Sequence, residues 1–401
     1  MGSNKKKKIS GKIKDPLAVT WSEKYDDQIQ GVWKKIPRFV ATFLVTIAVC
    51  TMGLAISGDW LNILVHLMKQ FNIEFPETLK TNSSLDNILE TLKLKNLWSF
   101  WIGSVIFSYA IYVIIGGFLH WYFYVRQRDR PEEWKCQPNK WMSPELERHE
   151  IIFGSLNLMV NASISAVVAC YISNGGYSTV YYGFSDYPWW WLILQVPVVF
   201  IYQDYATYWL HRIYHTPFLY KNFHKMHHKY KQPTAWSVTA IHPVESSHIQ
   251  LTLMIPIFVI PVHWASFYAC ALYAYYHGII DHSGINFKAF WWQPWQPDAI
   301  FHDNHHQYFH VNFAFNIYFW DILHGTYRRK DRLYTEDTYY GQGKALNEAT
   351  ASEIKADLQE RKSENPLAYR GNKLEFDLNE KDLKLELNGT YKKLRKNKKY
   401  Y

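Results

Sequence analysis

Three histidine clusters, separated along the chain, set the strongest limit on how this protein can fold. Five of its 18 histidines lie between positions 205 and 230, in HRIYH and HKMHH, and the H-x-x-H-H pattern returns as HDNHH at positions 302–306. On a helix, side chains three and four residues apart share a face, with Cβ atoms roughly 5–6 Å apart, so their imidazoles can share a metal ion. The clusters therefore predict one metal centre that closes only when the chain folds.

The number of histidines indicates two metal ions, because eight imidazoles are too many for one ion. Imidazole suits Zn, Cu, Fe and Ni, so the ligand type alone leaves the metal open. Zinc supports hydrolysis but not electron transfer, and its sites use three or four ligands. The predicted ligands are His211, His215, His224, His227, His228, His302, His305 and His306.

Long apolar runs place these clusters in a membrane protein. A membrane-spanning helix needs about 20 apolar residues, and four runs reach this length, at positions 39–57, 97–125, 151–173 and 189–210. Aromatic residues make up 18% of the chain, and the three tryptophans at 189–191 suit the membrane interface. We predict an all-α polytopic membrane protein with about four transmembrane helices.

The distribution of Lys and Arg predicts the orientation of these helices. Basic residues accumulate near the N-terminus, after the second run and after the fourth, whereas the loop after the third run has none. The loop after the first run carries four lysines and a sequon at Asn82, but it is long and therefore less diagnostic. Because cytoplasmic loops are enriched in Lys and Arg, both termini and all three clusters are predicted to face the cytosol.

A further apolar stretch at positions 249–280 is too long for one crossing and too short for two. We predict a re-entrant helix pair that breaks near Pro261 and His263, since proline interrupts a helix. A single crossing would put the third cluster on the opposite side of the membrane from the first two. The re-entrant pair instead gives a cytosolic, histidine-rich helical cap that holds a di-metal site.

The polar ends of the chain carry much of its net charge of +9. Such Lys-rich runs are typical of solvated tails that fix orientation, so no nucleic-acid partner is predicted. Lys398 and Lys399 form a dilysine pattern, typical of membrane proteins retrieved to the endoplasmic reticulum. A helix is predicted over positions 349–364. The four cysteines show no C-x-x-C pair and predict no disulfide framework.

Asp204 lies seven residues before His211, about two turns earlier on a helix. Asp204, Tyr208, His211 and His215 would lie along one stripe of a helix that continues out of the membrane. Metal-bound histidine usually donates its other ring N–H to a carboxylate or carbonyl group. We therefore predict that Asp204 orients a ligating imidazole.

Taken together, these motifs resemble the fatty acid hydroxylase and sterol desaturase superfamily, membrane enzymes whose H-x-x-x-H, H-x-x-H-H and H-x-x-H-H boxes bind a non-haem di-iron centre. The resemblance covers roughly residues 150–330. It is carried by HRIYH, LYKNFHKMHH, IHPVE, DHSG, HDNHH and WDILHGT. It implies a catalytic domain at 149–330. The charged ends and apolar runs predict the other three regions: a cytosolic basic tail at 1–36, an N-terminal transmembrane hairpin with a cytosolic loop at 37–148, and a cytosolic charged tail at 331–401.

The resemblance also implies the roles of individual residues. The eight box histidines would bind iron, together with one histidine between the last two boxes, for which His282 is the first choice and His277 the second. His242 of HPVE would lie close to the site as a ligand or a substrate-orienting residue. Asp303, inside the third box, would be catalytic together with Asp204 and His242.

The implied chemistry is O2-dependent removal of hydrogen from an unactivated C–H bond of a lipid, giving hydroxylation or desaturation. HPVE and HSG favour the sterol branch, either C-4 methylsterol oxidases or sterol C-5 desaturases, over a fatty acyl or sphingoid lipid hydroxylase. The cofactors would be two Fe ions and O2. Because the chain shows no nucleotide-binding glycine motif and no His-Pro-Gly-Gly haem signature, electrons would come from NAD(P)H through a separate cytochrome b5 and reductase. A histidine-rich metal transporter is the non-enzyme alternative.

Overall fold

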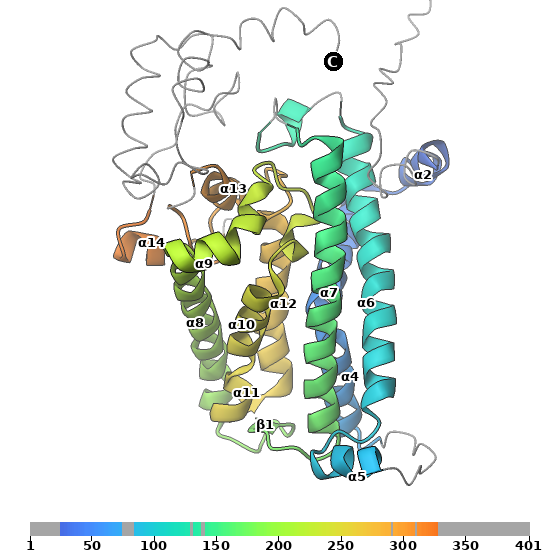
Figure 1. Cartoon of the computed structure of the whole chain (residues 1–401), viewed down its shortest axis with the longest axis vertical. Helices are drawn as coiled ribbons and strands as arrows, with labels where there is room; N and C mark the ends of the chain where they lie inside the picture. Colours follow the sequence, from blue (N-terminus) through green and yellow to red (C-terminus); the bar gives the residue numbers. More distant parts are fainter. Residues whose placement is uncertain are drawn as a thin grey trace, which may run out of the picture.

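The computed structural model describes residues 25–73, 84–128, 131–137, 141–289, 292–308 and 311–327. These residues are predominantly helical, and long helices run side by side (Figure 1). The end that carries α9 and α13, at the top of Figure 1, is called the upper end. The sequon at Asn82, a second sequon at Asn388, the helix predicted at 349–364 and the dilysine pattern lie outside the described residues.

The N-terminal half forms two long helices and a bent pair beside them. α6 packs against α7, and the bent pair α3–α4 packs against both. The elements are α2 (Asp26–Trp33), α3 (Arg38–Ser57), α4 (Asp59–Gln70), α5 (Ser84–Thr91), α6 (Leu97–Leu119), η1 (His120–Val125), η2 (Pro131–Glu133) and α7 (Pro144–Ser173).

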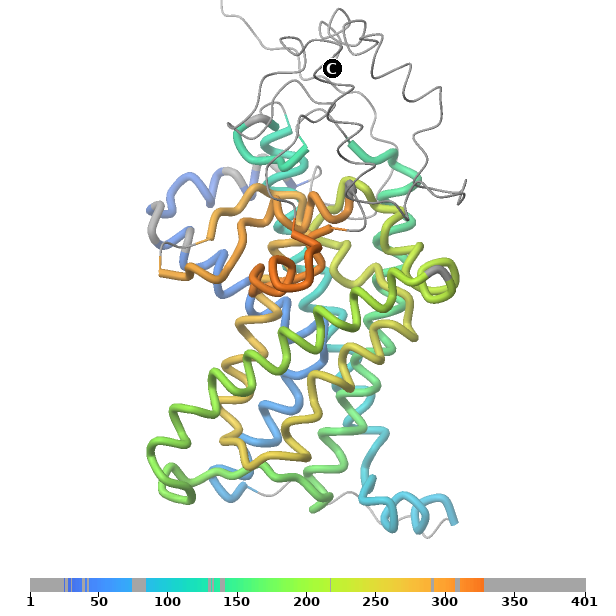
Figure 2. The backbone as a smooth tube through the Cα atoms, turned by 90° about the vertical axis from the view of Figure 1, so that its left-hand side faces the viewer, coloured from blue at the N-terminus to red at the C-terminus, as the bar shows by residue number. Residues whose placement is uncertain are grey.

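The C-terminal half adds three helices and the elements at the upper end. Figure 2 shows the last described segments lying across that end of the bundle. The elements are β1 (Val180–Tyr181), α8 (Trp189–Tyr214), α9 (Pro217–Asn222), η3 (His224–Lys229), η4 (Ser237–Thr239), α10 (Pro243–Met254), α11 (Pro256–Val259), β2 (Val262–His263), α12 (Trp264–Asp281), α13 (Ala299–Tyr308) and α14 (Phe319–Leu323).

The helix formed by the first apolar run, α3, ends in a sharp bend and is followed by α4. α3 and α4 meet at an angle of 94°, and Gly58 between them has a φ of 74°. A Cβ at this position would lie 2.8 Å from the Cβ of Ser165 on α7. Glycine is therefore required both by the left-handed backbone and by the close approach of α7.

Among the described residues, two helices are long and apolar enough to cross a membrane, at Leu97–Val125 and Pro144–Ser173. The bent pair would make a third span if it crosses as one unit. α8 has 26 residues but does not meet the same criteria, since Gln195, Gln203 and Asp204 interrupt its apolar sequence with buried polar groups. The prediction of about four spans is thus supported for two or three, and the full count stays a prediction.

The predicted break near Pro261 is confirmed. α10 and α11 descend, the chain turns, and α12 returns to the upper end (Figure 1). At the turn, β2 pairs in parallel with β1, with Val180 opposite Val262 and Tyr181 opposite His263. This hairpin brings the third histidine cluster back to the first two, as the sequence required.

Candidate metal centre

The three clusters converge at the upper end as two buried groups of histidines. In each group, one ring nitrogen from every histidine lies within 4.8 Å of the corresponding nitrogens of the others. The first group is His211, His215, His224, His228 and His305, and the second is His227, His282, His302 and His306. All nine imidazoles are buried, so neither group is an exposed surface cluster.

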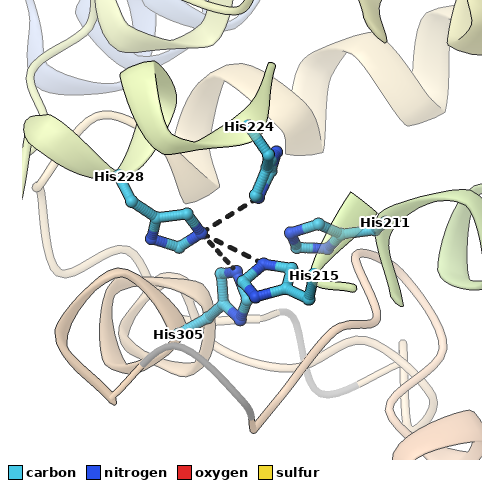
Figure 3. Close-up of side chains that lie close together, drawn as sticks. All are labelled: His211, His215, His224, His228 and His305. Carbon is cyan, nitrogen blue, oxygen red and sulfur yellow. Dashed lines mark hydrogen bonds between the residues drawn. The ribbon is translucent and has the colours of Figure 1, made fainter. Parts of the chain in front are cut away.

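The first group is assembled from three elements: the end of α8, η3 and α13 (Figure 3). His228 lies at its middle, with its Nε2 3.1 Å from Nε2 of His215, 3.0 Å from Nε2 of His224 and 3.2 Å from Nε2 of His305. Nitrogens bound about 2.1 Å from one ion are roughly 3.0–3.4 Å apart in octahedral or tetrahedral geometry. The spacing therefore fits a metal ion bound among these four nitrogens.

The second group adjoins the first. Nε2 of His302 lies 3.0 Å from Nε2 of His282, and the ring centroids of His228 and His306 are 5.1 Å apart across the two groups. Both ring nitrogens of His306 are buried and make no hydrogen bond to any described residue. Because buried polar atoms are normally satisfied, such nitrogens fit metal ligands. The nine imidazoles of the two groups are therefore suited to bind two adjacent metal ions.

Each H-x-x-H-H box contributes to both groups, which corrects the expectation that its imidazoles share one face. His224 and His228 belong to the first group, whereas His227 points to the second. In the third box the assignment is reversed, because His302 and His306 belong to the second group and His305 to the first. In α13, consecutive residues of the α-helix differ by about 100° in direction, so the neighbours His305 and His306 face different groups, whereas His302 and His306, four apart, face the same one. The second box lies on the 3-10 helix η3, and there too the neighbours His227 and His228 face different groups.

Most of these imidazoles are fixed by a hydrogen bond from the other ring nitrogen. Nδ1 donates to a backbone carbonyl in His305 (Val311, 2.7 Å), His211 (Phe313, 2.9 Å), His282 (Gly278, 2.7 Å) and His227 (Ala240, 3.4 Å). A carbonyl oxygen can only accept, so the proton is on Nδ1 and Nε2 remains free for a metal ion. The backbone thereby sets both the tautomer and the ring orientation.

His224 is held instead by a carboxylate that sequence reasoning missed. Its Nδ1 lies 2.6 Å from Oε1 of Glu245, and both side chains are buried. Glu245 belongs to the HPVE motif, but the only local signal was an acidic residue in the first turn of a helix, which helix N-termini generally favour. Its partner lies 21 residues earlier in the chain.

Burial favours the neutral form of five imidazoles of the two groups. The pKa values of His227, His228, His302, His305 and His306 lie well below 6.5, chiefly because burial disfavours the charged ring and secondarily because neighbouring imidazoles repel it. Metal ions bind the neutral form. The centre is therefore ready to bind metal at neutral pH.

Among the described residues, Asp204 makes no hydrogen bond to an imidazole, which corrects the expected role. Its carboxylate accepts hydrogen bonds from the backbone N–H groups of Asn316 and Ile317, both at 3.0 Å, and from the side chains of Asn316 and Trp320. These residues follow Phe313, whose carbonyl holds His211. Asp204 therefore fixes a loop that in turn positions a ligand.

Replacing Asp204 with asparagine should reduce activity by about tenfold, at the lower end of the range for groups that orient metal ligands. An amide would present N–H groups to donors that now face a carboxylate, and each unpaired buried donor costs about 1–3 kcal/mol. Turnover and bound metal, measured on the purified variant, check this prediction. Wild-type turnover would show that the loop does not depend on this carboxylate.

Three other predicted site residues lie outside both groups. His277 faces Gln293, with their side-chain nitrogens 3.4 Å apart, so the geometry selects His282 as the histidine between the boxes. His242 caps α10, its Nδ1 accepting from the N–H of Val244, because its position before the helix directs the ring to the backbone. Asp303 accepts from the side chain of Gln137 at 2.9 Å; its catalytic role stays a prediction.

The apolar helices and the two buried histidine groups define a class: a helical protein of membrane type with two adjoining histidine groups, each of which could hold a metal ion. Residues 196–326, which contain all nine histidines, match the family model of fatty acid hydroxylases. This match and the similar proteins described next support the sterol desaturase and fatty acid hydroxylase superfamily, which confirms the resemblance seen in the sequence.

Several curated proteins are similar to this chain. It is 30% identical over 183 residues to a Delta(7)-sterol 5(6)-desaturase of Leptosphaeria maculans, covering 45% of this chain and 50% of that protein. It is 30% identical over 181 residues to lathosterol oxidase of Mus musculus, covering 45% and 60%. It is 28% identical over 153 residues to a Delta(7)-sterol 5(6)-desaturase of Gibberella zeae, covering 38% and 47%. The chain thus spans about half the length of the curated relatives it matches, and no solved structure shows a significant match.

Proposed function

We propose that this protein is an O2-dependent di-iron oxidase of the membrane that acts on a sterol. The observation that carries the proposal is the pair of adjoining, buried, all-histidine groups within a segment that matches fatty acid hydroxylases. A fatty acyl or sphingoid lipid is the second candidate substrate. The names of the similar proteins, sterol desaturases and lathosterol oxidase, favour the sterol.

The residues present fit a pair of iron ions. Five histidines would hold one ion and four the other, and bound iron would supply the activation of O2 and the oxidation of a C–H bond. Imidazole ligands suit iron as well as zinc. Since oxidation of a lipid requires electron transfer, which zinc does not support, iron accords better with the relatives.

The protein's own contribution is to orient the ligands and to exclude water. The carbonyls of Val311, Phe313 and Gly278 hold three imidazoles with Nε2 towards the ions. Burial of all nine rings keeps bulk water from the centre, which strengthens electrostatic interactions within it and limits side reactions. A lipid that enters between apolar helices would reach the centre at the upper end of the bundle.

A metal transporter is less well supported by the same geometry. A transport path would distribute ion-binding groups along the depth of the membrane. The nine histidines are instead gathered at one end of the bundle, and both groups are closed by ligands from separate segments. The arrangement favours a resident centre over a moving ion.

Electrons would come from NAD(P)H through a separate cytochrome b5-like donor and reductase at the cytosolic surface. The protein would reside in the endoplasmic reticulum membrane, with both termini and the upper end in the cytosol. The charge distribution and the dilysine pattern support this placement.

The orientation can be tested by glycosylation mapping. If the upper end is cytosolic, the sequon at Asn82 lies on the lumenal side and can be modified, whereas the sequon at Asn388 cannot. Endoglycosidase digestion of the protein and of its Asn82→Gln and Asn388→Gln variants would detect the difference. Modification at Asn388 would invert the proposed topology.

The function is best tested by lipid analysis of cells that lack the protein. We expect a sterol substrate to accumulate and its oxidised or desaturated product to disappear, with both restored by the wild-type chain. Membranes supplied with O2 and NADH should show the same conversion, and anaerobic membranes should not. A change confined to acyl or sphingoid lipids would move the assignment to the second candidate, and no lipid change would contradict an enzymatic role.

A further inference from the structure

Phe315 is one aromatic side chain that lies against both histidine groups. Its ring centroid is 5.2 Å from that of His211, in the first group. It is 4.9 Å from that of His302 and 6.0 Å from that of His282, both in the second group. The ring is stacked on His211 and His282, with interplanar angles of 29° and 26°. Phe315 therefore spans the junction where the two ions would meet.

The backbone around Phe315 is held on both sides. The carboxylate of Asp321 accepts from the N–H groups of Phe313 and Ala314, at 2.9 and 2.8 Å. On the other side, Asp204 accepts from the two N–H groups that follow Phe315. The carbonyl of Phe315 itself accepts from Gln296 at 3.2 Å. These bonds restrict the position of the ring relative to the histidines.

Phe315 is also more exposed than the residues on either side of it. The residues on either side, at 313, 314, 316 and 317, are buried, whereas Phe315 is partly exposed. Phe313 makes a useful contrast: it is buried, and the histidine rings that it contacts among the described residues, those of His211, His215 and His305, all belong to the first group. An apolar, fixed and accessible ring beside ligands of both groups is suited to contact a hydrocarbon.

We propose that Phe315 determines specificity by packing against the part of the substrate that carries the reacting C–H bond. This proposal rests on the proposed function, because it assumes a sterol at the metal centre. The ring acts as a wall of fixed position, so it decides how closely the A and B rings of a sterol approach each of the two ions. Phe315 is a substrate-contacting residue, while Asp204, Asp321 and Gln296 position it.

Competition binding tests the proposal without relying on turnover. The iron-loaded, full-length protein in lipid vesicles would bind a fluorescent sterol, displaced by a 4-desmethyl sterol or by its 4,4-dimethyl counterpart. In Phe315→Ala, the ratio of the two affinities should shift about tenfold towards the bulkier sterol, since one or two carbon groups in an apolar pocket change discrimination by roughly 10–200-fold. Phe315→Leu should shift the ratio less, in the same direction, and serves if the alanine variant does not fold.

Phe313→Leu is the matched control from the same loop. It should lower iron content or stability but leave the affinity ratio within about twofold of wild type, well below the effect expected for a pocket residue. An unchanged ratio in both Phe315 variants would overturn the proposal, even if the wild type oxidises sterols. A shifted ratio without any sterol turnover would uphold it and contradict the proposed activity, whereas a wild type that binds neither sterol would contradict both.

Discussion

Replacing His305 with alanine should abolish turnover and lower the bound iron from two ions per chain towards one. His305 is fully buried, and its Nε2 lies 3.2 Å from Nε2 of His228, at the middle of the first group. Loss of a group that merely orients a ligand costs about 10–100-fold, so loss of the ligand itself should exceed about 100-fold. Metal analysis of the purified variant, together with O2-dependent turnover, measures both effects.

The design must separate a missing ligand from a damaged fold. The carbonyl of Val311 loses its partner in the variant, and an unsatisfied buried acceptor costs about 1–3 kcal/mol. Thermal unfolding of the metal-free proteins measures this contribution. His248→Gln is the matched control, because His248 is exposed and its ring nitrogen pairs with the hydroxyl of Tyr214 rather than with a group of the centre. Full iron content in His305→Ala would remove His305 from the ligand set.

Replacing Glu245 with glutamine should weaken iron binding and activity by about 10–100-fold, the range measured for carboxylates that orient metal-bound histidines. The substitution preserves shape but removes the negative charge 2.6 Å from Nδ1 of His224. That charge makes the imidazole a stronger donor to the ion, and hydrogen bonds to charged groups are about twice as strong as neutral ones. Iron retention during titration with a chelator measures the loss directly.

The effect of Glu245→Gln should be specific to the centre. Glu145→Gln provides the control, since Glu145 is exposed in the first turn of α7, and it should retain iron like the wild type. We expect Glu245→Gln to exceed Asp204→Asn in effect, because Glu245 contacts a ligand and Asp204 acts through a loop. The reverse order would show that the loop at 311–318 limits activity more than the orientation of His224 does.

Most of the ligand set follows from local spacing. Histidines three and four apart on a helix are neighbours wherever that helix lies, so the boxes could be recognised without a structure. The break near Pro261 is likewise local, because proline interrupts a helix. The third cluster was predicted to lie on the same side of the membrane as the first two, because a single metal centre requires the three clusters to meet.

The tertiary structure decided how the boxes are divided and which groups hold them. That His227 belongs to a different histidine group from His224 depends on the orientation of η3 relative to α13, which is set by contacts between segments about 80 residues apart. From the sequence, Asp204 was predicted to share a helical stripe with His211 and His215 and to orient a ligand, yet its carboxylate binds the backbone of a loop 112 residues later.

The sequence by itself determined that imidazoles would gather in a helical, apolar protein, because helical periodicity and hydropathy act over a few residues. Only the tertiary structure decided the five-and-four division, the choice of His282 over His277, the role of Glu245 and the placement of Phe315 over both groups. These depend on hydrogen bonds and packing between segments far apart along the chain, whose relative positions are fixed only when the whole bundle is assembled.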